Sequence, residues 1–142
     1  KNVIAEREDF DSAYYFLSTI YKKEGQMKEA LEILERGYKN NPSIYKIATY
    51  YGTALTDAGR PDDALTVLTQ ALSLIDYDPE LWNYIGVAYW RKNDLAKALE
   101  SYQKSLALDP KYAVVLNNLG SVYLAMFMQD GNRRLPGRGV AI

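Results

Sequence analysis

The sequence predicts an all-α protein built from stacked pairs of helices. Residues of one class recur every 34 positions, apolar residues recur every three or four, and Pro, Gly and Asp occupy the expected helix ends. Spacings of this length are typical of repeat architectures. The recurring columns are Gly52, Gly86 and Gly120; Ala30, Ala64 and Ala98; and Leu17, Tyr51, Ile85 and Leu119.

The repeat divides the chain of 142 residues into units 11–44, 45–78 and 79–112, followed by a partial unit over 113–128. We interpret residues 1–10 as the end of a preceding second helix, because KNVIAER aligns with QKSLALD at 103–109. Residues 129–142 are expected to form a flexible tail outside the repeat, since Pro and Gly oppose a helix there. Neither end has an obvious polar cap, so we expect a segment of a longer array.

The third unit shows the helix signals most clearly. Asp78-Pro79-Glu80 predicts a helix start, with a capping carboxylate, a proline at the first helical position and an acid near the positive dipole end. The segment 92–94 predicts a turn, and Asp109-Pro110 predicts the end of the second helix. Gly25 and Gly59 mark the same turn in the first two units, where a left-handed residue is favoured.

The columns suggest distinct packing roles. Small residues should sit where the two helices of a pair approach closely, because a longer side chain would separate them. Large residues should fill the space between successive pairs. The large set is Tyr21, Trp82, Tyr89, Tyr102 and Tyr123.

Composition narrows the functional classes. The chain has no Cys and no His, which removes disulfides, Cys/His zinc sites and His-dependent triads. Its net charge of −1 disfavours general nucleic-acid binding. The longest weakly polar run, 113–128, is too short and too rich in amides to span a membrane. We expect no cofactor, no metal and no intrinsic enzyme activity.

The pattern resembles the tetratricopeptide repeat family over about residues 1–126. The third unit carries the resemblance most fully, in Trp82, Ile85-Gly86, Tyr89, Ala98, Tyr102 and Pro110. The resemblance implies an α-solenoid: a right-handed superhelix of antiparallel helix pairs, with a concave face lined by the first helix of each pair. It also implies that a partner peptide lies across those first helices.

Mapping the groove-facing positions of that family onto this chain gives a set of candidate contacts. One groove-facing position of the repeat holds three aromatic residues in succession, each 34 residues after the last: Phe16, Tyr50 and Tyr84. The same position in the partial fourth unit holds Asn118. Rings with hydroxyls and amides beside them suit an extended or helical peptide. The alternative is that these rings simply pack between adjacent first helices. The candidates are Tyr15, Thr49, Tyr50, Asn83, Tyr84, Trp90, Asn117 and Asn118.

A subclass of the family clamps the carboxylate tails of heat-shock chaperones with Lys, Asn and Arg. The corresponding positions here are Tyr15, Thr19, Tyr50, Glu80 and Tyr84, and a frame shifted by one repeat agrees only at Asn118. We therefore argue against such a clamp. The charges near the groove (Lys22, Lys23, Lys46 and Arg91 against Asp57 and Glu80) indicate either a partner of mixed charge or ordinary solvated faces.

The function predicted is a protein-interaction module with a peptide partner of unknown identity. Two alternatives stay open. Uncapped repeat ends favour self-association, with Val122, Met126, Phe127 and Met128 at the interface. The array is also compatible with a substrate-recruiting region of a larger enzyme.

Overall fold

The computed structural model describes residues 3–41 and 43–133, and the side chains of 13–41 and 43–131. This part of the chain is entirely helical, without strands. Its seven helices are α1 (Val3–Lys23), α2 (Met27–Asn40), α3 (Tyr45–Asp57), α4 (Pro61–Leu72), α5 (Pro79–Arg91), α6 (Leu95–Leu108) and α7 (Ala113–Arg133). The predicted all-α architecture is confirmed.

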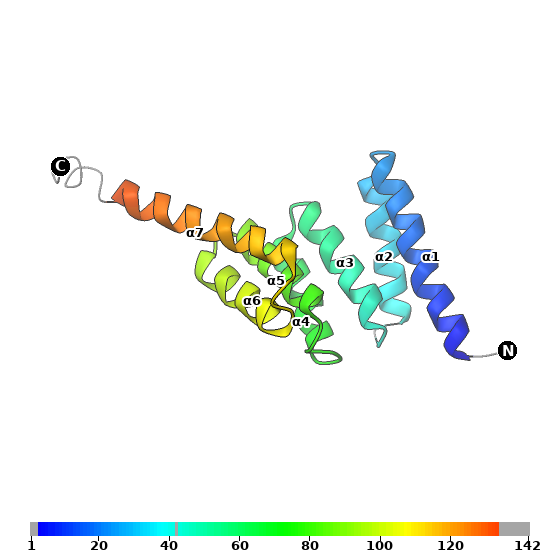
Figure 1. Cartoon of the computed structure of the whole chain (residues 1–142). Coiled ribbons are helices and arrows are strands. Elements are labelled where there is room, and N and C mark those ends of the chain that lie inside the picture. Colours follow the sequence, from blue (N-terminus) through cyan, green and yellow to red (C-terminus); the bar gives the residue numbers. More distant parts are fainter. Residues whose placement is uncertain (1–2, 42, 134–142) are drawn as a thin grey trace, which may run out of the picture.

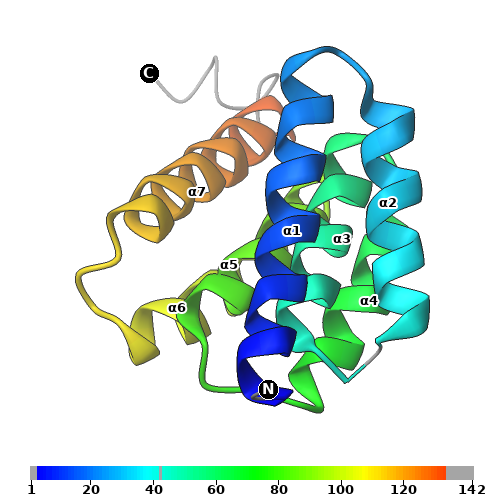
Figure 2. The same ribbon diagram turned by 90° about the vertical axis from the view of Figure 1, so that its right-hand side faces the viewer.

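The helices form two layers. Each helix packs against its neighbours in sequence, and the odd-numbered helices also pack against one another, α1 on α3, α3 on α5 and α5 on α7. Figure 1 shows the resulting elongated stack, and Figure 2 shows α1 and α3 one behind the other with α2 and α4 beside them. We call the layer of α1, α3, α5 and α7 the inner layer, because it carries the site described below.

The turns between paired helices repeat the same geometry. Gly25, Gly59 and Asn93, spaced by 34 residues, all adopt left-handed backbone angles with φ of 75°, 81° and 64°. The amide after each of them donates to a carbonyl five residues earlier, as in the Schellman motif. The predicted turn positions are therefore confirmed, with asparagine substituting for glycine in the third unit.

Close approach within a pair explains two glycines of the repeat. A Cβ added at Gly52 would lie 2.5 Å from Leu68 on α4, and one at Gly86 would overlap the ring of Tyr102 on α6. Tyr102 therefore packs against α5 within its own pair, and it also fills the space toward the next pair, as the sequence predicted. It is 2% exposed and belongs to a core that also contains Val115, Leu119 and Val122.

Both ends of the repeat differ from prediction. Helix α1 runs without a break through residue 10, so residues 3–10 extend the first helix of unit one instead of ending a separate helix. The segment Glu8–Asp11 contains neither Gly nor Pro to interrupt it. Helix α7 likewise continues through Gly131 to Arg133, beyond the predicted boundary at 128. The rest of the predicted tail, 134–142, lies outside the described residues.

Candidate functional site

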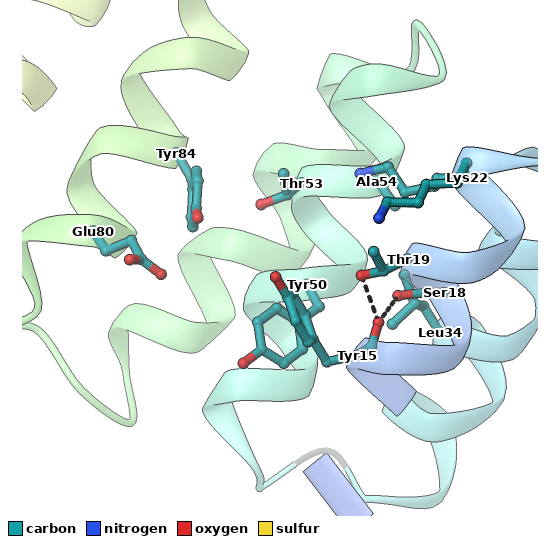
Figure 3. A pocket seen from close by; sticks show the side chains of 11 residues that line it. Tyr15, Ser18, Thr19, Lys22, Leu34, Tyr50, Thr53, Ala54, Glu80 and Tyr84 are labelled. Atoms are coloured by element: carbon teal, nitrogen blue, oxygen red, sulfur yellow. Dashed lines mark hydrogen bonds between the residues drawn. The ribbon is translucent and has the colours of Figure 1, made fainter. Parts of the chain in front are cut away.

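A pocket of about 580 Å³ opens on the inner layer between α1, α3 and α5. Three of the eight predicted site residues line it: Tyr15 from α1, Tyr50 from α3 and Tyr84 from α5. Figure 3 shows Tyr84 and Glu80 on one side, Tyr15 and Tyr50 in the middle, and Lys22 with Thr19 on the other. The pocket thus crosses three successive repeats and presents a tyrosine from each.

Tyr15 and Tyr50 form the aromatic centre of the pocket. Their ring centroids are 4.8 Å apart with an interplanar angle of 43°, and Tyr15 meets Phe16 edge-on at 5.7 Å. Tyr15 remains 43% exposed and Phe16 63% exposed. Two rings held against each other lose little further freedom on binding, so they make a rigid contact surface for a ligand.

Tyr84 and Glu80 form the opposite wall. They are four residues apart on α5, which places them on one face of the helix. Burial raises the pKa of Tyr84 well above its ordinary value, and the nearby negative charge of Glu80 raises it further. A tyrosine phenol is protonated at neutral pH, and the raised pKa keeps this one a hydrogen-bond donor in alkaline solution as well.

The basic residues of the pocket differ in how their charge is balanced. The Nζ atom of Lys22 lies 3.1 Å from Oδ2 of Asp57, so an ion pair joins α1 to α3. Lys23 also lines the pocket, and no ion pair involves it among the described residues. Asp57 thus offsets one of the two lysine charges on this side.

Thr49 and Asn83 do not reach the pocket. Thr49 is buried and its hydroxyl donates to the carbonyl of Tyr45 at 2.8 Å. Asn83 is 3% exposed, and its Oδ1 accepts a hydrogen bond of 2.8 Å from Nδ2 of Asn118. These polar groups serve the packing of the inner layer.

Trp90 and Asn118 lie in a second, smaller hollow of about 240 Å³ between α5 and α7. Arg91 and Ser121 also line it. Asn117 is exposed and lines neither hollow. The structure therefore separates the predicted set into a tyrosine pocket, a hydrogen-bonded amide pair with an adjacent hollow, and isolated positions.

Neighbouring first helices meet through residues 35 apart. Tyr15 contacts Tyr50, Lys22 pairs with Asp57, and Asn83 pairs with Asn118. The sequence ladder was aligned at 34, the length of the repeat, so it did not predict these partners. The one-residue offset arises because each inner helix presents one face to the preceding repeat and a different face to the next.

Several pocket residues were absent from the predicted set. Thr19 and Thr53 occupy equivalent places in their repeats, and this repetition was the sequence signal available for them. Leu34 and Ala54 line the pocket from the apolar core, and nothing in the sequence distinguished them from other core residues. Ser18 is a further addition, and Lys22, Lys23 and Glu80 are charges that the sequence had placed near the groove without naming them as contacts.

No cluster of three or more potential metal-ligating acids exists within the described residues. None of the helices in that part of the chain combines the length and apolar character needed to cross a bilayer. The pocket chemistry is thus that of rings, hydroxyls and a few charges.

Family models described as "Tetratricopeptide repeat" match residues 11–44 and 52–113, about two thirds of the chain together. The chain belongs to the tetratricopeptide repeat family. The resemblance inferred from the sequence is thereby confirmed.

Curated relatives share this repeat region. BBSome complex member BBS4 of Bos taurus is 29% identical over 110 residues, which are 78% of this chain and 21% of BBS4. SPINDLY of Hordeum vulgare, whose name describes a UDP-N-acetylglucosamine–peptide N-acetylglucosaminyltransferase, is 33% identical over 138 residues, 92% of this chain and 13% of SPINDLY. The chain therefore spans less than a third of these relatives.

Solved tetratricopeptide domains share the fold. The first such domain of human RPAP3 aligns with a TM-score of 0.77 at 19% identity, covering 86% of this chain and 96% of that one. The first tetratricopeptide domain of Spaghetti (RPAP3), bound to the HSP90 peptide SRMEEVD, aligns with a TM-score of 0.74 at 19% identity. The alignment covers 83% of this chain and 94% of that one. YrrB, described as having an unusual peptide-binding site, aligns with a TM-score of 0.70 at 26% identity. The alignment covers 76% of this chain and 56% of that one.

Proposed function

We propose that this chain is a protein-interaction module that binds a segment of a partner protein in the pocket of α1, α3 and α5. The observation that carries the proposal is the convergence of Tyr15, Tyr50 and Tyr84, one from each of three successive inner helices. Tyrosine supplies a large contact area and a polar tip at low entropic cost, and it is enriched at energetically important interface positions. The peptide complexes among the structural neighbours support the general role.

The partner segment is not an acidic chaperone tail. The positions of a carboxylate clamp hold Tyr15, Thr19, Tyr50, Glu80 and Tyr84, and a carboxylate at Glu80 would repel a second one. The likeness to RPAP3, at 19% identity, is a likeness of fold.

The test is a screen of the purified chain against a peptide array, alongside the variant Tyr50→Ala/Tyr84→Ala. We expect selective binding with micromolar affinity, about −8 kcal/mol, that is lost in the variant. Tyr77→Ala/Tyr123→Ala is the matched control, because both tyrosines are exposed and lie outside the pocket. Circular dichroism would establish that all forms are folded. Equal binding by the pocket variant and the control would overturn the proposal.

A second candidate function is self-association through α7. Its exposed apolar side chains are Val114, Leu116, Tyr123, Leu124, Phe127 and Met128. Of the interface predicted from sequence, Val122 is buried in the core and Met126 is packed against it, so only Phe127 and Met128 remain available. Light scattering of the wild type and of Phe127→Glu tests this function, since a monomer at high concentration rules it out.

The recruiting role within a larger enzyme is favoured only by the SPINDLY relative, and the full reading frame would test it.

A further inference from the structure

Within the part of the chain that the structure describes, Glu80, like Lys23, is a charged pocket residue without an ion-pair partner. Lys22, by contrast, is matched by Asp57 at 3.1 Å. Glu80 is exposed at the edge of the aromatic pocket, so its negative charge is available to a cation that enters from the solvent.

The rings of the pocket add to this preference. Tyr84 stands beside Glu80 and faces Tyr50 and Tyr15 across the pocket (Figure 3). The face of a tyrosine ring carries negative electrostatic potential and attracts ammonium and guanidinium groups within about 6 Å. Lys104 over Trp82, at 4.6 Å from the ring centroid, shows such a contact elsewhere in this chain.

The surroundings of Glu80 are consistent with negative potential. The pKa values of Tyr45, Tyr84 and Tyr112 are all raised, chiefly by burial, and Glu80 contributes in each case. Lys46 acts in the opposite direction on Tyr45. Asp78 contributes as well at Tyr45 and Tyr112, so both carboxylates at the start of α5 give this region its negative potential.

We propose that the pocket recognises its partner segment through one basic side chain, Lys or Arg, which sits between Tyr50 and Tyr84 with Glu80 as its counter-ion. This inference rests on the proposed function and specifies the chemistry of the partner. Arginine fits best, since its planar guanidinium can stack on a ring while it pairs with a carboxylate. Lys23, the other charge not matched by an ion pair, belongs to the last turn of α1, across the pocket from Glu80, and disfavours a second basic residue there.

The experiment is selection of a displayed library of random twelve-residue peptides on the whole chain. We expect Lys or Arg at one fixed position in the selected peptides, with about tenfold weaker binding when that residue is replaced by Gln. Glu80→Gln removes the charge and keeps the shape, so it should weaken binding about tenfold and abolish the preference for the basic residue. Glu100→Gln is the matched control: it makes the same substitution at an exposed carboxylate on α6, outside the pocket, and it should retain the preference.

The outcomes separate the two proposals. Selected peptides without a basic residue, or a preference that survives Glu80→Gln, would overturn this inference and leave peptide binding intact. Acidic peptides whose binding depends on Lys23 would overturn it as well. Failure to select any peptide, or equal binding by Tyr50→Ala/Tyr84→Ala, would instead overturn the proposed function itself. Circular dichroism of each variant shows that a lost preference is not a lost fold.

Discussion

Gly86 on α5 and Gly120 on α7 occupy the same place in successive repeats, yet their surroundings are opposite. A Cβ at Gly86 would collide with Tyr102 on α6, whereas a Cβ at Gly120 would meet nothing within 4 Å. The difference arises because α6 packs against α5, while the described residues include no helix on the corresponding face of α7. A repeat position is therefore constrained by the helix that covers it and not by the repeat pattern alone.

The largest expected effect on the free energy of unfolding comes from replacing each of these glycines, in separate variants, by alanine. Gly86→Ala should destabilise the fold by about 3 kcal/mol, because overpacking against a buried ring exceeds the gain in helix propensity. Gly120→Ala should stabilise it by up to about 1 kcal/mol, since only the propensity term remains. Chemical denaturation of the two variants measures both. Effects of the same sign and size would show that α7 is covered in solution.

The next effect concerns the buried amide pair between α5 and α7. Asn118→Ala leaves the buried Oδ1 of Asn83 without its hydrogen bond, and such a loss costs about 2 kcal/mol. Asn117→Ala is the control, because this neighbour on the same helix is exposed. We expect denaturant midpoints to fall for the first variant and to stay near wild type for the second. A neutral Asn118→Ala would contradict the role assigned to the pair.

The fold was predictable because it depends on local signals that repeat. Helix starts, left-handed turns and small-residue columns recur every 34 residues, so each unit reinforced the interpretation of the next. Tyr50 and Tyr84 were expected in the groove from the resemblance to the family, and both line the pocket, whereas Phe16, at the same place in the first repeat, does not.

The exact partners were not predictable. The offset of 35 between contacting residues depends on which faces of neighbouring inner helices meet, and a 34-residue alignment does not show this. Thr49 and Asn83 were therefore predicted for the groove although they lie in the packing between helices. The continuation of α1 through residues 3–10 was missed for a different reason, because the alignment with 103–109 outweighed the absence of a helix breaker.

The next expected effect is on the free energy of unfolding when Tyr102 is replaced. It is small at neutral pH and larger at alkaline pH. Burial raises its pKa in the folded state, so the folded protein holds the phenolic proton more tightly than the unfolded chain does. Stability is therefore unaffected below about pH 10 and falls as the pH rises above it, by up to about 1.4 kcal/mol per pH unit. Tyr102→Phe should unfold like wild type at pH 7 and lose this part of the alkaline slope. Denaturation at pH 7 and at two pH values above 10 measures the difference, and an unchanged slope would contradict the assignment.

The smallest expected effect distinguishes the two ends of the inner layer. Lys22 and Asp57 join α1 to α3 by an ion pair whose side chains are about one-third exposed, so removing it should cost only about 0.5 kcal/mol. Salt screens such a pair, whereas the neutral amides of Asn83 and Asn118 carry no net charge to screen. The difference in stability between wild type and Lys22→Ala should therefore shrink at 1 M salt, while the difference for Asn118→Ala persists. If both differences shrank together, the joint between α5 and α7 would depend on charges other than this amide pair.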